Sequence, residues 1–94
     1  MEVEDKIKQM RPFPLKVLKS IIKQGVATSN ATISQFKDSK QAVWGAISYL
    51  KRNELVEPFG KDEEGKWQWQ VKPEVKDQKE NILDLIDRIT GRKR

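Results

Sequence analysis

One face of a predicted helix carries polar side chains at regular helical spacing. We predict that this helix begins at Ser39 and ends near Asn53, with Val43 at the centre of its apolar face. At about 100° of turn per residue, the opposite face carries Gln41, Gly45, Ser48 and Arg52. In the major groove of DNA, arginine pairs with guanine, glutamine pairs with adenine, and serine bonds to bases or to phosphate. The pattern therefore predicts a DNA contact, and the alternative is an ordinary solvated face.

Gly45 and the flank of the same helix add to this interpretation. A glycine inside a helix costs about 0.5–1 kcal/mol relative to alanine, and close approach of a base or a DNA backbone is a reason to keep one. Lys40, Trp44 and Lys51 lie on the flank. Trp44 has two interpretations: it contacts a sugar or a thymine methyl group, or it packs on a neighbouring strand, which is the commoner role of a helical tryptophan.

A short helix and a tight turn precede this helix. We expect the short helix at residues 29–37, with Thr28 as its N-cap. Thr28 and Ser29 stand at a helix N-terminus, where backbone N–H groups favour a phosphate, and plain capping explains them equally well. Ser39 caps the helix that follows. The predicted buried side chains of that following helix are Val43, Ala46, Ile47 and Leu50.

Two strands joined by a charged loop come next. The first strand begins at residues 55–57, and the second, residues 67–71, alternates apolar with polar side chains as a half-buried strand does. Lys61 and Lys66, at the two ends of the loop, can reach phosphates. The three carboxylates between them would be repelled by DNA. The acidic tip is therefore either solvated or a contact with another protomer or another protein.

Apolar residues at helical spacing predict three further helices. They are residues 1–10, a helix that Pro14 opens and Gly25 ends, and a last helix from Lys76 that precedes the basic tail 92–94. The apolar stripe of the last helix either packs on its own domain or pairs with a second copy, with the first helix completing the interface. We predict a homodimer, because a twofold dimer matches a palindromic DNA site. The predicted interface residues are Val3, Ile7, Met10, Ile82, Leu85, Ile86 and Ile89.

The composition limits the functions open to the chain. Its 94 residues suit one domain, and 19 Lys and Arg against 14 Asp and Glu give a net charge of +5, which favours a polyanionic partner. The chain has no cysteine and no histidine, so it lacks the usual metal ligands and nucleophile–base pairs. We expect no enzymatic activity, no cofactor and no metal. Without a long apolar run or an apolar signal core, we also expect no membrane partner and a cytoplasmic, nucleoid-associated location.

These elements predict a fold that is mainly α with a small β-hairpin, in the α+β class. Their order is that of a winged helix-turn-helix with extra N- and C-terminal helices, and it places the helix at residues 39–53 in the major groove. We expect a single domain over residues 1–94. Its parts are an N-terminal helix (1–12), a winged-helix core (14–72), and a C-terminal dimerisation helix with the basic tail (76–94).

The stretch 28–56, TSNATISQFKDSKQAVWGAISYLKRNELV, resembles the helix-turn-helix of winged-helix regulators of the PadR and MarR kind. Thr28 matches the cap of the first helix, and Ser39 matches the serine that opens the recognition helix. The likeness covers residues 14–72 and departs from the family pattern at the turn, residues 37–38. In size and in its terminal helices, the chain is also similar to small archaeal winged-helix dimers, including PadR-like adaptors of plasmid partition systems.

The resemblance implies a sequence-specific DNA-binding protein that acts as a homodimer, in the first place a transcriptional regulator. From the helical spacing and side-chain chemistry described above, we predict that the base-reading residues are Gln41, Ser48 and Arg52. Two alternatives stay open: a centromere-binding partition protein that spreads along DNA, and an adaptor that binds another protein through the hairpin. The full set of predicted contacts with double-stranded DNA is Thr28, Ser29, Ser39, Lys40, Gln41, Trp44, Gly45, Ser48, Lys51, Arg52, Lys61 and Lys66.

Overall fold

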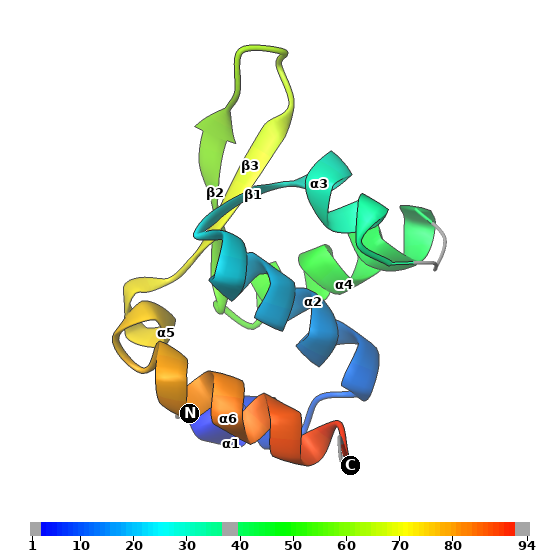
Figure 1. Cartoon of the computed structure of the whole chain (residues 1–94). Coiled ribbons are helices and arrows are strands. Elements are labelled where there is room, and N and C mark those ends of the chain that lie inside the picture. Colours follow the sequence, from blue (N-terminus) through cyan, green and yellow to red (C-terminus); the bar gives the residue numbers. More distant parts are fainter. Residues whose placement is uncertain (1–2, 37–39, 92–94) are drawn as a thin grey trace.

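Helix α2 (Pro12–Gln24) lies at the centre of the fold, and the other elements pack around it (Figure 1). The computed structural model describes residues 3–36 and 40–91. Within these residues, helices combine with a small antiparallel sheet, so the α+β class is confirmed. The other elements, in chain order, are α1 (Val3–Lys8), β1 (Val26–Thr28), α3 (Ser29–Ser34), α4 (Lys40–Arg52), β2 (Val56–Lys61), β3 (Trp67–Val71), α5 (Pro73–Asp77) and α6 (Lys79–Ile89).

The apolar face of α2 and its two ends fix this central helix. Its buried residues include Leu18 and Ile21, as the helical spacing predicts. The helix begins at Pro12, earlier than the predicted start at Pro14. The reason is that N–H groups in the first turn have no partner within a helix, so proline is tolerated there. Gly25 ends the helix as predicted, with a φ of 79° and an N–H that donates to the carbonyl oxygen of Ile21 at 3.1 Å.

The predicted cap of α3 is confirmed. The Thr28 hydroxyl accepts a hydrogen bond from the Ala31 N–H at 3.1 Å, which satisfies one of the donors that a helix start leaves unpaired. The helix ends at Ser34, earlier than its sequence pattern predicts. Residues 37–39, among them the predicted cap Ser39, lie outside the described residues.

Helix α4 buries the apolar stripe that its spacing predicts. The buried side chains of this stripe are Val43, Ala46, Ile47 and Leu50. At its C-terminus, the N–H of Leu55 donates to the carbonyl of Leu50 and the N–H of Glu54 donates to the carbonyl of Lys51, both at 3.0 Å. This is the Schellman arrangement, which needs a left-handed residue after the cap. Glu54 takes that position with a φ of 59°, and the chain then turns into the hairpin.

The three strands form an antiparallel sheet in the order β1-β3-β2. The central strand β3 pairs with β1, where Ala27 lies opposite Trp69, and with β2 on its other side. An irregularity between Pro58 and Gly60 interrupts the pairing of β2 with β3, and Gly60 has a φ of 128° there. The β2–β3 hairpin projects away from the helices (Figure 1). Strand β2 also contacts α4, so the hairpin starts beside this helix.

The C-terminal region forms two helices where the sequence pattern predicts one. Pro73 follows β3, as expected, and it also opens the short helix α5, because its fixed φ and missing N–H suit the first position of a helix. Val75 anchors α5 in the core. Gln78 separates α5 from α6, so the predicted helix from Lys76 is corrected to one that begins at Lys79.

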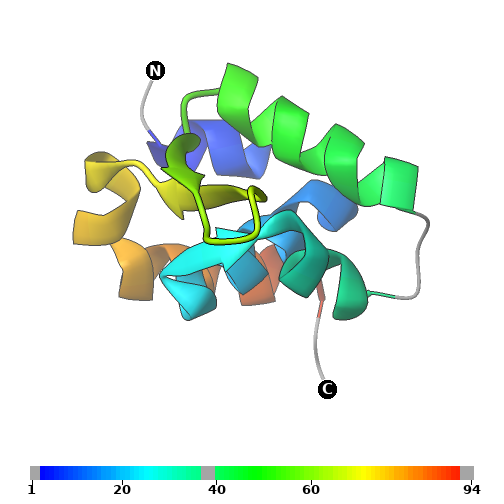
Figure 2. The same ribbon diagram turned by 90° about the horizontal axis from the view of Figure 1, so that it is seen from above.

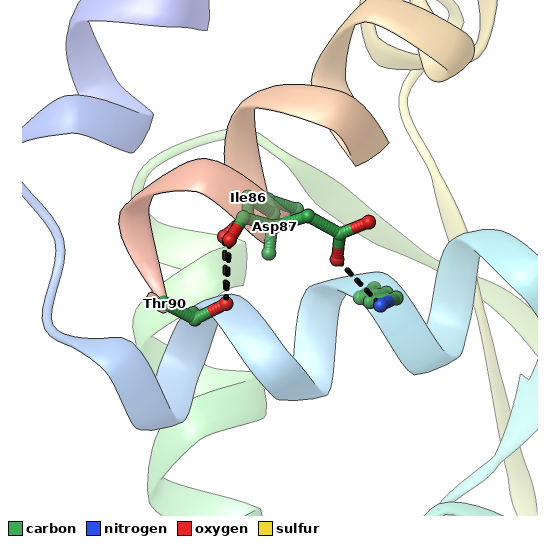
Figure 3. Close-up of polar contacts among 4 residues, drawn as sticks. Ile86, Asp87 and Thr90 are labelled. Atoms are coloured by element: carbon green, nitrogen blue, oxygen red, sulfur yellow. Dashed lines mark hydrogen bonds and ion pairs between the residues drawn. The ribbon is translucent and has the colours of Figure 1, made fainter. Parts of the chain in front are cut away.

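Helix α6 packs against α2 and α1 (Figure 1). The Nζ atom of Lys19 on α2 lies 2.6 Å from Oδ1 of Asp87 on α6. At the end of α6, the hydroxyl of Thr90 donates to the carbonyl of Ile86 at 2.8 Å. Figure 3 shows both contacts, with Ile86, Asp87 and Thr90 labelled. The ion pair links α6 to α2, whereas the Thr90 hydrogen bond closes the last turn of α6 itself.

Most of the predicted dimer interface lies inside the core of the single chain. The fully or nearly fully buried members are Ile7, Met10, Ile82 and Ile86. A buried side chain has no surface to offer a second copy, so the interface prediction for these four is corrected to packing within the core of the single chain. The members that are only partly buried are Val3, Leu85 and Ile89. For these three, a role in an interface stays a prediction.

Candidate nucleic-acid interface

The predicted DNA-reading face of α4 lies on the surface. Its four residues, which we call the reading face, are Gln41, Gly45, Ser48 and Arg52, and all four are exposed. The orientation derived from helical spacing is therefore confirmed. The side chains of this set make no hydrogen bond or ion pair with any residue in the described part of the chain. Figure 2 shows α4 along one side of the molecule.

Gly45 stands in the middle of the reading face, and no packing within the chain requires it. A Cβ atom built at Gly45 has no other heavy atom within 4 Å, so alanine would fit. The residue is not among the described residues with positive φ, so its backbone does not require glycine either. The helix thus carries a cost of about 0.5–1 kcal/mol relative to alanine. Close approach of an external group to the helix backbone is a physical reason for that cost.

The substitution Gly45→Ala is expected to raise the free energy of unfolding by about 0.5–1 kcal/mol. Alanine loses less backbone entropy on folding, and its methyl group would meet open space at this position. Urea denaturation of the two proteins, followed by circular dichroism, measures the difference. A lower stability of the variant would contradict the open surroundings of Gly45.

A broad depression borders the reading face on the side of the α1–α2 junction. Its volume is about 600 Å³, and its rim includes Gly45. Arg11 and Arg52 are its charged lining residues, and Phe13 and Tyr49 contribute apolar surface. Guanidinium groups bind phosphate in a bidentate manner. The two guanidinium groups therefore give the depression the chemistry to bind a phosphate.

Gln9 and Arg11 also line this depression, and the sequence pattern predicts neither as a contact. Arg11 is the N-cap residue of α2 and is exposed, and it lies far from α4 along the chain. Only the packing of α2 on α4 brings it to the same depression as Arg52. A basic residue directly before the proline that opens a helix was the available signal, but the sequence does not reveal which helices pack together.

The opposite flank of α4 faces the hairpin. Trp44 packs edge-to-face on Trp69, with ring centroids 6.4 Å apart and an interplanar angle of 79°. The packing interpretation of Trp44 is therefore confirmed, and its contact with DNA stays a prediction for the part of the ring that remains exposed. With Lys51, Pro58 and Trp67, the two rings line a smaller groove of about 280 Å³. The reading face thus lies between two depressions, each with at least one cation.

The hairpin tip uses one of its acidic residues to build its own turn. The carboxylate of Asp62 accepts hydrogen bonds from the N–H groups of Glu64 and Lys66, both at 2.9 Å. Lys61 and Lys66 are exposed at the two ends of the tip. The Nζ atom of Lys61 lies 5.2 Å from the ring centroid of Trp67. Asp62 therefore has a structural role, whereas phosphate contacts by the two lysines stay predictions.

The remaining predicted contacts lie near the starts of α3 and α4. Lys40 is exposed in the first turn of α4. The Thr28 hydroxyl is engaged as a cap, which supports the capping interpretation of this side chain. The side chain of Ser29 and the whole of Ser39 lie outside what the structure describes. The core of the candidate interface is therefore the reading face with its two flanks.

Among residues 3–36 and 40–91, no group of acidic side chains is arranged to hold a metal ion. In the same ranges, no helix combines the length and the apolar character that a membrane crossing needs. In comparisons with known protein families, curated proteins and solved structures, nothing matches this chain.

Proposed function

We propose that the chain is a winged helix-turn-helix protein that binds duplex DNA through the reading face of α4. Support comes from the element order α2, β1, α3, α4, β2, β3 and from the strand order β1-β3-β2. Both agree with the resemblance of residues 14–72 to winged-helix regulators. In this proposal α4 enters the major groove, and the hairpin lies beside it as the wing.

The observation that carries the proposal is the reading face itself. Its side chains have base-reading chemistry, they are exposed, and they make no polar contact within the described residues. At its centre, Gly45 leaves open space where a Cβ atom would otherwise stand. An ordinary solvated helix face would gain stability from alanine at this position. A partner that approaches the helix backbone explains both features together.

The two flanks suit the two DNA strands that border a major groove. Arg11 lies on one flank, and Lys51 lies on the other, with Lys40 exposed at the helix start. Contacts from these cations to phosphates position a protein on DNA, whereas base contacts give specificity. The net charge of +5 has the sign that this role requires.

As to its role in the cell, we propose a homodimeric transcriptional regulator. The partly exposed residues of the terminal helices, Val3, Leu85 and Ile89, are the part of the predicted interface that remains available to a second copy. A twofold dimer would present two copies of α4 to a palindromic site. A protein that spreads along DNA in partition would instead extend its footprint as its concentration rises.

The proposal is tested by selecting sites from random duplexes and measuring binding by fluorescence anisotropy at several salt concentrations. The described basic residues that flank the reading face of α4 are Arg11, Lys40 and Lys51. At about 0.9 per neutralised phosphate, these three predict a slope of log K against log salt of about −2.7 for one protomer and about −5.4 for two. Footprinting on the selected site then separates a bounded operator from spreading. Absence of binding at about 50 mM salt would contradict the proposal.

A further inference from the structure

The groove between α4 and the hairpin has a composition that phosphate binding alone does not explain. Trp44, Lys51, Pro58, Trp67 and Trp69 line it, and its volume is about 280 Å³. This is slightly below the range of about 300–1,000 Å³ that is typical of ligand pockets. The groove therefore has room for a small ring system and is too small for a large ligand.

The tryptophans have unequal exposure, which indicates which of them meets a ligand. Trp69 is buried, and Trp44 is half-buried and packs against it edge-to-face, so this pair forms the inner wall. Trp67 is 46% exposed and stands further out on β3, on the same face of the strand as Trp69 because strand residues alternate. Trp67 thus offers an open aromatic surface next to a rigid aromatic wall.

The charge around the groove selects the kind of ring. Lys51 lines the groove, and the ammonium of Lys61 lies 5.2 Å from the centroid of the Trp67 ring. Lys51 is the one charged side chain among the described lining residues, and none of these residues carries a carboxylate. Two nearby carboxylates along the hairpin are already engaged: Asp62 is bound into the turn, and Glu57 lies 3.8 Å from the Nζ atom of Lys72. A nucleotide combines a flat base with a negatively charged phosphate, and it is therefore complementary to this arrangement.

We infer that the groove binds an unpaired nucleobase of DNA, stacked on Trp67, with its phosphate bound by Lys51 and Lys61. The base takes the place of the Lys61 ammonium on the ring, since an exposed cation–π contact is weak, and the ammonium moves to the phosphate. Bases stacked inside an intact duplex cannot present a face to the groove. The protein therefore prefers sites where a few nucleotides beside the duplex are unpaired. This inference rests on the proposed function of α4 as a duplex-binding element.

The test compares three kinds of DNA. They are the selected duplex, the same duplex with three unpaired thymidines placed on one side of the site or on the other, and a thymidine 12-mer. For the native chain, we expect the unpaired thymidines at one side to tighten binding about fivefold to 100-fold, as stacking of one base on an aromatic residue does. Trp67→Ala should lose this preference and keep the affinity for the intact duplex. Trp67→Phe should keep part of the preference, because phenylalanine also stacks.

Phe59→Ala is the matched control. Phe59 is an aromatic residue of the same hairpin with 54% exposure, and it does not belong to the lining of the groove. We expect this variant to behave as the native chain does. Because Trp67 and Phe59 are both exposed, circular dichroism should show that both alanine variants fold.

The outcomes separate this inference from the proposed function. Equal binding of duplexes with and without unpaired thymidines would overturn the inference and leave the function of α4 intact. The same conclusion would follow if Trp67→Ala kept the preference, or if Phe59→Ala removed it. Binding of the thymidine 12-mer in a Trp67-dependent manner, without duplex binding, would support the groove and contradict the proposal for α4. If the chain bound none of the three DNAs, both would be overturned.

Discussion

The double variant Gln41→Ala/Arg52→Ala is expected to weaken the binding of each protomer to the selected duplex by about 30-fold to 20,000-fold. Each bidentate contact to a base is worth about 1–3 kcal/mol, and about 1.4 kcal/mol corresponds to a tenfold change in Kd. Both side chains are exposed and have no polar partner among the described residues, so the fold should be unaffected. Fluorescence anisotropy at one fixed salt concentration measures the loss.

The chain offers a matched control for this variant in Gln78→Ala/Arg88→Ala. It removes the same two residue types and the same charge from the surface of the C-terminal region, where both residues are exposed. Arg88 pairs with Asp84 within α6 at 2.9 Å, and such an exposed pair contributes little to stability. We expect the control to bind DNA nearly as the native chain does. An equal loss of affinity in both variants would mean that net charge, and not the reading face, accounts for binding.

The substitution Ile86→Ala is expected to lower the free energy of unfolding by about 2–5 kcal/mol. Ile86 is 0% exposed and lies on the face of α6 that packs against α2, so alanine would leave a cavity. Small domains have a total stability of about 5–15 kcal/mol, which makes this a large effect. Urea denaturation at several protein concentrations measures it.

The concentration series decides whether Ile86 belongs to the chain's own core. If it does, the loss of stability should be the same at every protein concentration. The matched variant Leu85→Ala changes a neighbouring residue that is only partly buried, and it should cost less stability while weakening any dimer. A loss in Ile86→Ala that depends on protein concentration would show that α6 is stabilised by a second copy.

Helical periodicity predicted α4 well, because one side of this helix is buried and the other is open. The buried stripe of Val43, Ile47 and Leu50 and the exposed positions of Gln41 and Arg52 follow from the same rotation per residue. The cap at Thr28 and the stop at Gly25 were predictable for a local reason, namely the hydrogen bonds and backbone angles of single residues. Capping residues and regular helical spacing can be identified from the sequence alone.

Features that depend on which elements pack together were not predictable in this way. The stripe of α6 has the same spacing whether it faces its own chain or a second copy, so the burial of Ile82 and Ile86 had to come from the structure. Arg11 entered the candidate interface only because α2 packs on α4. The helix α5 was missed because Pro73 ends a strand and opens a helix at the same place.

The measurement that tests the central claim most directly is an NMR titration of the ¹⁵N-labelled chain with the selected duplex. We predict that the largest backbone amide shifts occur along the reading face, at Gln41, Gly45, Ser48 and Arg52, with smaller shifts at Arg11. The amides of α6 should change little. Large shifts confined to the hairpin or to α6, with α4 unchanged, would contradict the assignment of α4 as the element that binds DNA.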